Sequence, residues 1–140
     1  MTKPLFIQQS FRHHEFKPHF HDDYSIGIIT RGEQKLHIAN DKKRIAKGQI
    51  RLINPGELHH VDRACTWSYA NILIPQEDIL QIAGDMYQKD FKGSICFKNH
   101  IDDRRLIEKF VTLYGSLDRG VGYEESYIGF IEVLLRDYSI

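Results

Sequence analysis

Cysteine is scarce in this sequence. Its 140 residues contain only Cys65 and Cys96, too few and too irregularly placed for a disulfide framework or a paired-cysteine zinc site. We interpret both as small, reduced side chains that are buried in the core, as is typical of a reducing compartment. The scarcity of cysteine therefore favours a cytoplasmic protein.

Long apolar runs and an excess of charge of one sign are also lacking. No stretch approaches the roughly 20 apolar residues that a membrane span requires, and the N-terminus has no apolar signal-peptide segment. Lys plus Arg and Asp plus Glu number 19 each, so the chain has no basic footprint for nucleic-acid phosphates. Motifs for a Ser-His-Asp triad, a Gly-rich phosphate loop or a paired-cysteine redox centre are missing as well. We expect no membrane partner and no direct contact with DNA.

The first half of the chain, up to about Pro75, has the pattern of short strands. Apolar and β-branched residues alternate with polar ones between Gly and Asn-Asp turn signals. A turn is expected at Arg31-Gly32-Glu33 and a bend at Gly48. Short strands at this spacing predict a sandwich or a small barrel. The expected strands cover residues 24–30, 34–39, 43–47, 49–54 and 66–74.

Beyond Pro75 the apolar residues recur with the period of an α-helix. Helices are expected over residues 76–88, after an N-cap at Asp102, and from Tyr123 onward. The last helix could pack its apolar stripe on its own chain or against the same helix of a second protomer, and we expect the second arrangement, a homodimer. The sequence stops inside this helix without a stop signal, which suggests a longer protein. The stripe consists of Tyr127, Phe130, Ile131, Leu134, Leu135 and Tyr138.

Three histidines are the most informative residues of the first half. His19 and His21 share one face of a strand because side chains alternate with a period of two. His59 follows a Pro-Gly turn and can meet them inside a barrel. Such a trio can hold zinc or nickel with water in the open position, or it can line a small-molecule pocket, and the residues leave both open. His60 has the opposite parity from His59 and is expected to be exposed. The remaining histidines are expected at the surface without partners at ligand spacing: His13, His14, His37 and His100.

Taken in order, the motifs of this chain resemble the N-terminal effector-binding domain of AraC-type transcription regulators. The resemblance implies a mostly β fold, a cupin-type double-stranded β-helix (jelly-roll barrel) over residues 1–75, followed by about three α-helices over residues 76–140 that pair two protomers. It also implies a helix-turn-helix DNA-binding domain, which is absent from this chain. The motifs are His19-Phe-His21, Tyr24-Ser-Ile-Gly27, Arg31-Gly-Glu33, Gly48-Gln-Ile-Arg-Leu-Ile-Asn-Pro-Gly-Glu-Leu-His59 and Trp67-Ser-Tyr69 with Ile74-Pro75.

The resemblance also implies a small-molecule effector, such as a sugar, inside the barrel. The contacts of the arabinose-responsive member fall by position on Arg31, Tyr69 and Asn71, with Trp67 nearby. Tyr69 and Asn71 replace a His and a Trp of that member, which makes arabinose itself doubtful. Together with the histidine trio, the expected effector-binding set is His19, His21, Arg31, His59, Trp67, Tyr69 and Asn71.

A different class of function competes with sensing. The general cupin pattern adds a Glu shortly after the first two histidines, where this chain has Ser25 and Ile26. The missing Glu argues for a binding domain that is not an enzyme and requires no cofactor. The alternative is a free-standing metal-dependent cupin enzyme, a dioxygenase, isomerase or decarboxylase, with zinc or nickel at the trio. A protein-interaction module without a ligand is a third possibility.

Overall fold

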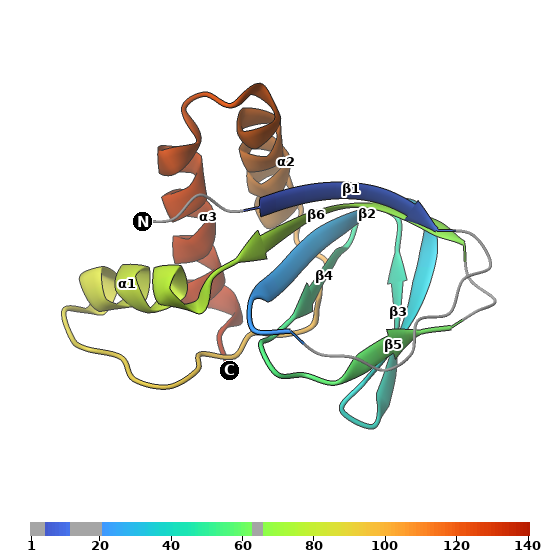
Figure 1. The fold of residues 1–140 in the computed structure, drawn as a ribbon, viewed down its shortest axis with the longest axis horizontal. Helices are drawn as coiled ribbons and strands as arrows, with labels where there is room; N and C mark the ends of the chain where they lie inside the picture. Colours follow the sequence, from blue (N-terminus) through green and yellow to red (C-terminus); the bar gives the residue numbers. More distant parts are fainter. Residues whose placement is uncertain (1–4, 12–20, 63–65) are drawn as a thin grey trace.

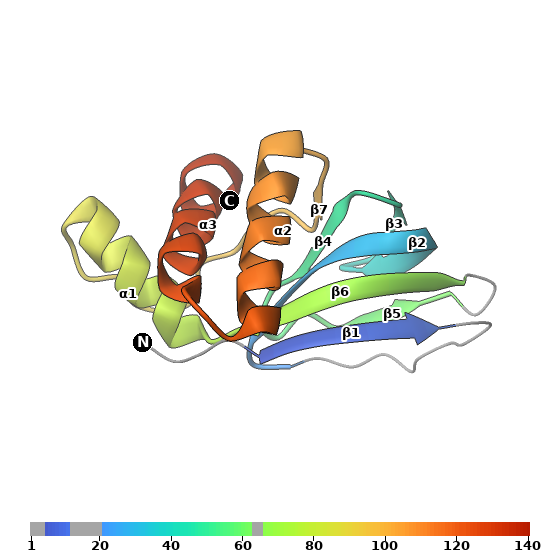
Figure 2. The ribbon, with the colours of Figure 1, turned by 90° about the horizontal axis from the view of Figure 1, so that it is seen from above.

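The computed structural model describes residues 5–11 as backbone, and residues 21–62 and 66–140 with their side chains. Strands curl into a barrel, and three helices pack against one end of it (Figures 1 and 2). The expected cupin-type barrel followed by helices is confirmed. The elements are β1 (Leu5–Phe11), β2 (Tyr24–Ile38), β3 (Asp41–Ala46), β4 (Ile50–Ile53), β5 (His59–Val61), β6 (Trp67–Ile74), α1 (Gln76–Tyr87), β7 (His100–Ile101), α2 (Arg104–Arg119) and α3 (Tyr123–Tyr138).

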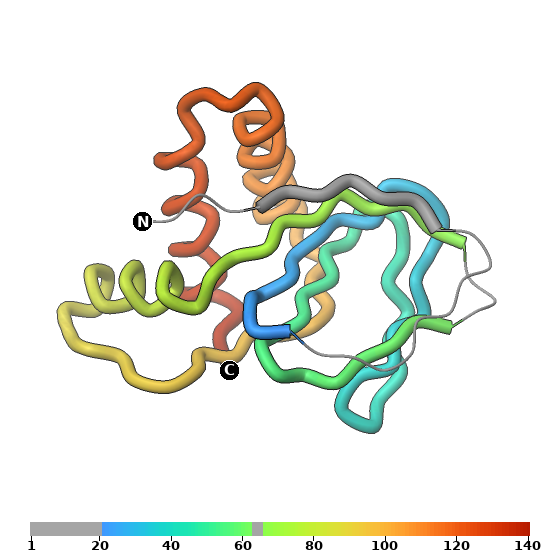
Figure 3. Tube along the Cα trace, in the orientation of Figure 1, coloured from blue at the N-terminus to red at the C-terminus, as the bar shows by residue number. Residues whose placement is uncertain are grey.

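The long strand β2 belongs to both sides of the barrel. Its first half pairs with β4 and β6, and its second half pairs with β3 and β5. Between the halves lies a β-bulge at Ile29 and Arg31, followed by Gly32 with a φ of 69°. A bulge bends a strand and increases its twist, and the bend is visible along the tube in Figure 3. The turn expected at Arg31-Gly32-Glu33 is therefore wrong, because the strand bends there without reversing.

In the sheet, which has the order β1-β6-β2-β4-β7, the strands β2, β4 and β6 carry buried residues on both faces. Alternate residues of β2, β4 and β6 point outward to the helices, among them Ile26, Leu52 and Ile72. The intervening positions point into the barrel, among them Ile29 and Ile53. Two separate cores result, one between sheet and helices and one inside the barrel. All four residues of β4 are buried for this reason.

The apolar stripe of α3 lies in the core between the helices and the sheet. Tyr127, Phe130, Ile131 and Leu134 are 0% exposed, and Leu135 is also buried. The hydroxyl of Tyr138, which is half-buried, donates to the Asp103 carboxylate. The expected dimer interface on this stripe is wrong, because the stripe is buried within the chain's own core, where α3 packs against α1 and α2.

Helix α2 begins one residue later than expected. Its N-cap is Asp103, whose carboxylate accepts a hydrogen bond of 3.0 Å from the backbone N–H of Arg105. Asp102, the expected cap, instead accepts a bond of 3.1 Å from the Gln49 side chain. At the other end, Gly120 has a φ of 72°, the left-handed conformation that commonly ends helices. The adjacent aspartates explain the shift of one residue.

Residues 95–99 connect β4 with the end of α3. The Asn54 side chain donates to the Phe97 carbonyl at 2.9 Å and accepts from the Phe97 N–H at 2.8 Å. Phe97 also forms a β-bridge with Ser139. On this segment Cys96 is exposed and free, so the expectation of a buried side chain is wrong for it, while Cys65 lies outside the described residues. None of the described helices is long and apolar enough to span a membrane.

Candidate functional site

A row of three residues crosses the inner face of the sheet. Gly27 of β2 pairs with Arg51 of β4 on one side and with Asn71 of β6 on the other. Residues paired across neighbouring strands point to the same face. Arg51 and Asn71 therefore both enter the barrel interior, with only a glycine between them.

The Arg51 guanidinium reaches across Gly27 to the far strand. Its Nη2 atom donates to the Asn71 amide oxygen and to the Ser25 hydroxyl, both at 2.8 Å. Asn71 in turn donates to the Ser25 hydroxyl at 2.9 Å. The guanidinium carbon lies 5.2 Å from the centroid of the Tyr69 ring, within reach of a cation–π interaction. A Cβ atom at Gly27 would lie 2.7 Å from the Asn71 oxygen, so this arrangement requires glycine.

The polar row holds a buried positive charge. Arg51 is 6% exposed, and burial lowers the pKa of its guanidinium from the ordinary value. A guanidinium nevertheless stays protonated in proteins. Burial also raises the pKa of the Tyr69 phenol, which keeps this neighbour neutral. The groups around the guanidinium are two polar side chains and an aromatic ring, none of which carries a negative charge: Ser25, Asn71 and Tyr69.

A second polar side chain faces the interior further along β2. Gln34 is buried and has the same parity as Leu36 and Ile38, which belong to the inner core. Within the described structure its side-chain carbonyl oxygen accepts no hydrogen bond. Buried polar atoms are rarely unsatisfied in a folded protein. The barrel interior thus carries polar groups in an otherwise apolar lining, as small-molecule sites do.

The structure brings together two residues of the histidine trio. The rings of His21 and His59 lie 5.3 Å apart in an edge-on arrangement, and His59 is 4% exposed. Each Nδ1 atom lies near a backbone carbonyl, that of Asp23 at 2.8 Å and that of Glu57 at 3.0 Å. If Nδ1–H donates, the neutral ring presents Nε2 as an acceptor or metal ligand. His19 lies outside the described residues, and the described ones contain no group of three ligands that includes this pair.

A different histidine cluster lies on the outer face of the barrel. His37 of β2 pairs with His60 of β5, and their rings stack at 4.4 Å with an angle of 4°. His37 Nε2 contacts the Asp62 carboxylate, whose other oxygen lies 3.1 Å from the Lys42 ammonium. Burial raises the pKa of Asp62, but hydrogen bonds from His37 and Lys42 together bring it below its ordinary value. The expectation that His37 and His60 are isolated is wrong, because strand pairing joins them.

The remaining expected effector contacts separate into two groups. Trp67 and Asn71 are buried and Tyr69 is half-buried on the inner face of β6. Arg31 lies on the bulge of β2 and is exposed, away from the polar row. Arg51 was not among the expected contacts. Its signal in the sequence is a lone charge inside the apolar run Ile50–Ile53.

Comparison with known proteins agrees with this architecture. The family model described as AraC-like ligand binding domain matches residues 4–130. The HTH-type transcriptional regulator YbfI of Bacillus subtilis (strain 168) is 24% identical over 131 residues, which cover 89% of this chain and 47% of the regulator. The chain thus spans about half the length of this curated relative.

Solved structures of regulators share the fold. The AraC-like transcriptional activator CuxR superimposes with a TM-score of 0.66 at 10% identity, covering 98% of this chain and 53% of CuxR. An apo variant of ToxT from Vibrio cholerae strain SCE256 gives a TM-score of 0.62 at 16% identity, covering 93% and 53%. At these identities the likeness concerns the fold alone. Since the family model matches most of its length, the chain belongs to the family of AraC-like ligand-binding domains.

Proposed function

We propose that this chain is the effector-sensing domain of a cytoplasmic transcription regulator. It binds a small molecule inside the barrel and relays the event to a helix-turn-helix domain outside these 140 residues. The observation that carries the proposal is the buried polar row of Arg51, Asn71 and Ser25 on the inner face of the sheet. A few convergent polar groups in an apolar interior fix the orientation of a ligand. The effector shifts the regulator between states through its different affinity for each.

The proposed chemistry is binding without conversion. On the described inner faces of β2, β4, β5 and β6, no carboxylate is available as a general base. The histidine pair His21 and His59 also lacks the glutamate ligand of the general cupin pattern. A metal-dependent cupin enzyme requires an open metal position and a group that moves protons or positions the substrate. These side chains favour a sensor over that alternative.

A thermal-shift screen tests the sensing proposal. Sugars, amino-acid derivatives, aromatic acids and lipid fragments are added singly to the purified chain. A compound at about 100 times its Kd stabilises the folded state by about 2.7 kcal/mol. We expect at least one class to raise the melting temperature of the wild type and of Lys47→Ala, an exposed control, but not of Asn71→Ala. The proposal fails if no compound shifts the wild type, or if Asn71→Ala responds equally.

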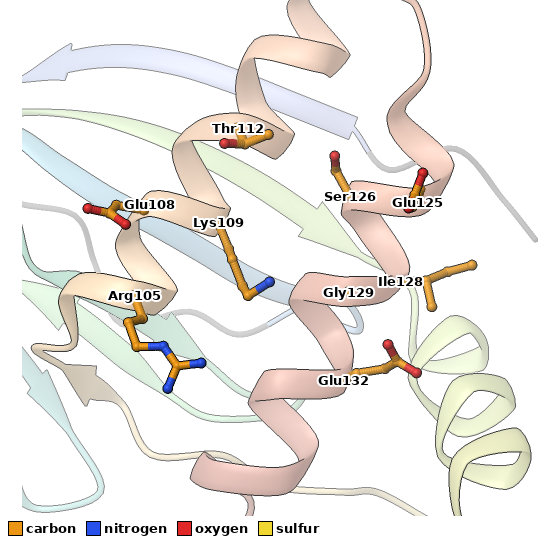
Figure 4. A pocket seen from close by; sticks show the side chains of 9 residues that line it. All are labelled: Arg105, Glu108, Lys109, Thr112, Glu125, Ser126, Ile128, Gly129 and Glu132. Carbon is orange, nitrogen blue, oxygen red and sulfur yellow. The ribbon is translucent and has the colours of Figure 1, made fainter.

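We also propose that two copies associate through the outer faces of α2 and α3. An open groove runs between these helices, and Arg105 and Lys109 extend into it from α2 (Figure 4). Glu125 and Glu132 line its other side on α3. A twofold axis parallel to the groove would place α2 of one copy against α3 of the other, so that the basic side chains of Arg105 and Lys109 would meet acidic ones. Such charge complementarity favours a specific partner.

Charge exchange tests this interface. Sedimentation equilibrium should show a dimer for the wild type, a monomer for Lys109→Glu, and a dimer again for Lys109→Glu combined with Glu132→Lys. Lys47→Glu, which changes charge on the barrel, is the control and should remain a dimer. A monomeric wild type, or a Lys109→Glu variant that stays dimeric, would rule out this surface.

A further inference from the structure

The barrel interior contains a charge that no described residue neutralises. The side chain of Arg51 is buried, since only 6% of the residue's surface is exposed. It makes no ion pair with any described residue, and the described contacts of its side chain are with neutral groups. Its Nε atom is buried and makes no hydrogen bond within the described structure. An arginine in this state is unusual, because buried charges are normally paired.

The local structure keeps this charge inside the barrel. Gly27 leaves the space through which the guanidinium passes, and a Cβ there would meet the Asn71 oxygen at 2.7 Å. Ser25 and Asn71 hold Nη2 from the far side, which directs the guanidinium across the sheet. Ser25 and Asn71 also bond to each other, so this pair keeps a hydrogen bond without Arg51. The neighbours therefore fix the position of the guanidinium, although Ser25 and Asn71 do not depend on it for all of their hydrogen bonds.

We propose that the effector is a small organic acid whose carboxylate neutralises Arg51. This inference rests on the proposed function and specifies its ligand class. A carboxylate accepts charge-assisted hydrogen bonds from a guanidinium, and these are about twice as strong as neutral ones. In a buried site the gain is large because water does not screen the pair. The body of the acid would lie against Ile29, Ile53 and the Tyr69 ring, which belong to the inner core.

In the ligand-free protein, burial of the Arg51 charge without a counter-charge among the described residues lowers the free energy of unfolding. Replacing a buried ion pair with apolar side chains of similar volume is often neutral or stabilising, and Arg51 has no described ion-pair partner that its replacement would leave unpaired. Arg51→Met should therefore melt no lower than about 3 °C below the wild type, given the usual relation between stability and melting temperature. A structural arginine behaves differently, since its loss lowers the melting temperature by more than this.

The binding test uses matched pairs of compounds. Carboxylates and their primary amides (benzoate with benzamide, phenylacetate with phenylacetamide, hexanoate with hexanamide) and the sugar pair glucuronate with glucose are added at about 10 mM, where even weak ligands give a shift. Inorganic phosphate is a separate arm, because a guanidinium also binds phosphate. The proteins are the wild type, Arg51→Met, Arg51→Lys and the exposed control Lys47→Met.

The expected result is a shift with the acid of at least one pair and none with its amide or neutral partner. The shift should persist in Lys47→Met, weaken in Arg51→Lys, which keeps the charge, and vanish in Arg51→Met. A neutral compound that binds as well as its acid, or phosphate that binds in place of every carboxylate, would overturn the ligand class while leaving a sensing barrel. No shift with any compound, here and in the broader screen, would overturn both proposals. A strongly destabilised Arg51→Met assigns the residue a structural role and also overturns the inference.

Discussion

Glycine 27 provides the sharpest test of the inner face. A Cβ atom added there would lie 2.7 Å from the Asn71 amide oxygen, 2.9 Å from the Ala70 carbonyl and 3.3 Å from a Tyr69 ring carbon. The Ala70 carbonyl is backbone in β6, which is hydrogen-bonded on both sides to β1 and β2, so it cannot move aside cheaply. Asn71 can move only by giving up its contacts with Arg51 and Ser25. Gly27→Ala should therefore overpack the row.

The size of the effect follows from these contacts. Adding a methyl group to a packed interior costs about 1–3 kcal/mol, and each hydrogen bond lost adds about 1 kcal/mol. We expect Gly27→Ala to lose about 2–4 kcal/mol of unfolding free energy, which for a domain of this size lowers the melting temperature by roughly 5–12 °C. The effector response should be lost with it, since the side chains that hold the ligand are displaced.

Gly115→Ala is the matched control for this change. Gly115 lies within α2, and an added Cβ would meet only the flexible end of the Arg119 side chain, at 3.2 Å. Alanine is a better helix former than glycine, so this variant should gain up to about 1 kcal/mol. Urea unfolding of both variants measures the two effects. Equal midpoints for Gly27→Ala and the wild type would refute the packing of the inner row.

Three further outcomes are expected. Asp103→Ala should lower the free energy of unfolding by about 1 kcal/mol through loss of the helix cap, while Asp102→Ala should change it little. Because the hydrogen bond from Tyr138 lowers the pKa of Asp103, the stabilisation is present above the unfolded pKa of about 3.9 and is lost as pH falls through the lower folded pKa. Urea unfolding of Asp103→Asn should lack this pH dependence. Tyr127→Phe should cost about 1.5–3 kcal/mol, because a 2.7 Å hydrogen bond to the buried Asp78 carboxylate disappears, and an unchanged unfolding midpoint would contradict this. Extensive chelation should leave the effector-induced melting shift intact, whereas loss of the response together with stoichiometric zinc or nickel in elemental analysis would support the metal alternative.

Much of the architecture could be predicted from local patterns. Alternation and turn residues located most of the strands, and helical periodicity located the three helices to within a residue or two. These signals depend on neighbours along the chain. These local patterns did not predict the bend of β2, because the sequence Arg31-Gly32 is compatible with a turn and with a β-bulge. Whether the strand reverses there depends on its pairing with Trp67 and Ser68, which are distant in sequence.

The candidate site was predicted less completely, for related reasons. Periodicity shows that the stripe of α3 is buried but not what covers it, and here α3 packs against α1 and α2 of the same chain. His37 and His60 meet only through the register of β2 and β5. Trp67, Tyr69 and Asn71 could be placed on one face because a single strand carries them. The place of Arg51 in the site could be recognised only from the pairing of β4 with β2 and of β2 with β6.

The segment 95–99 gives the barrel a mechanical connection to the end of the chain's last helix. Strand β4 carries Arg51 in its middle, and the next residue after the strand, Asn54, is bonded twice to Phe97. Phe97 bridges to Ser139, just beyond α3. A displacement of β4 from within the barrel would thus be passed through Asn54 and Phe97 to Ser139, directly after α3.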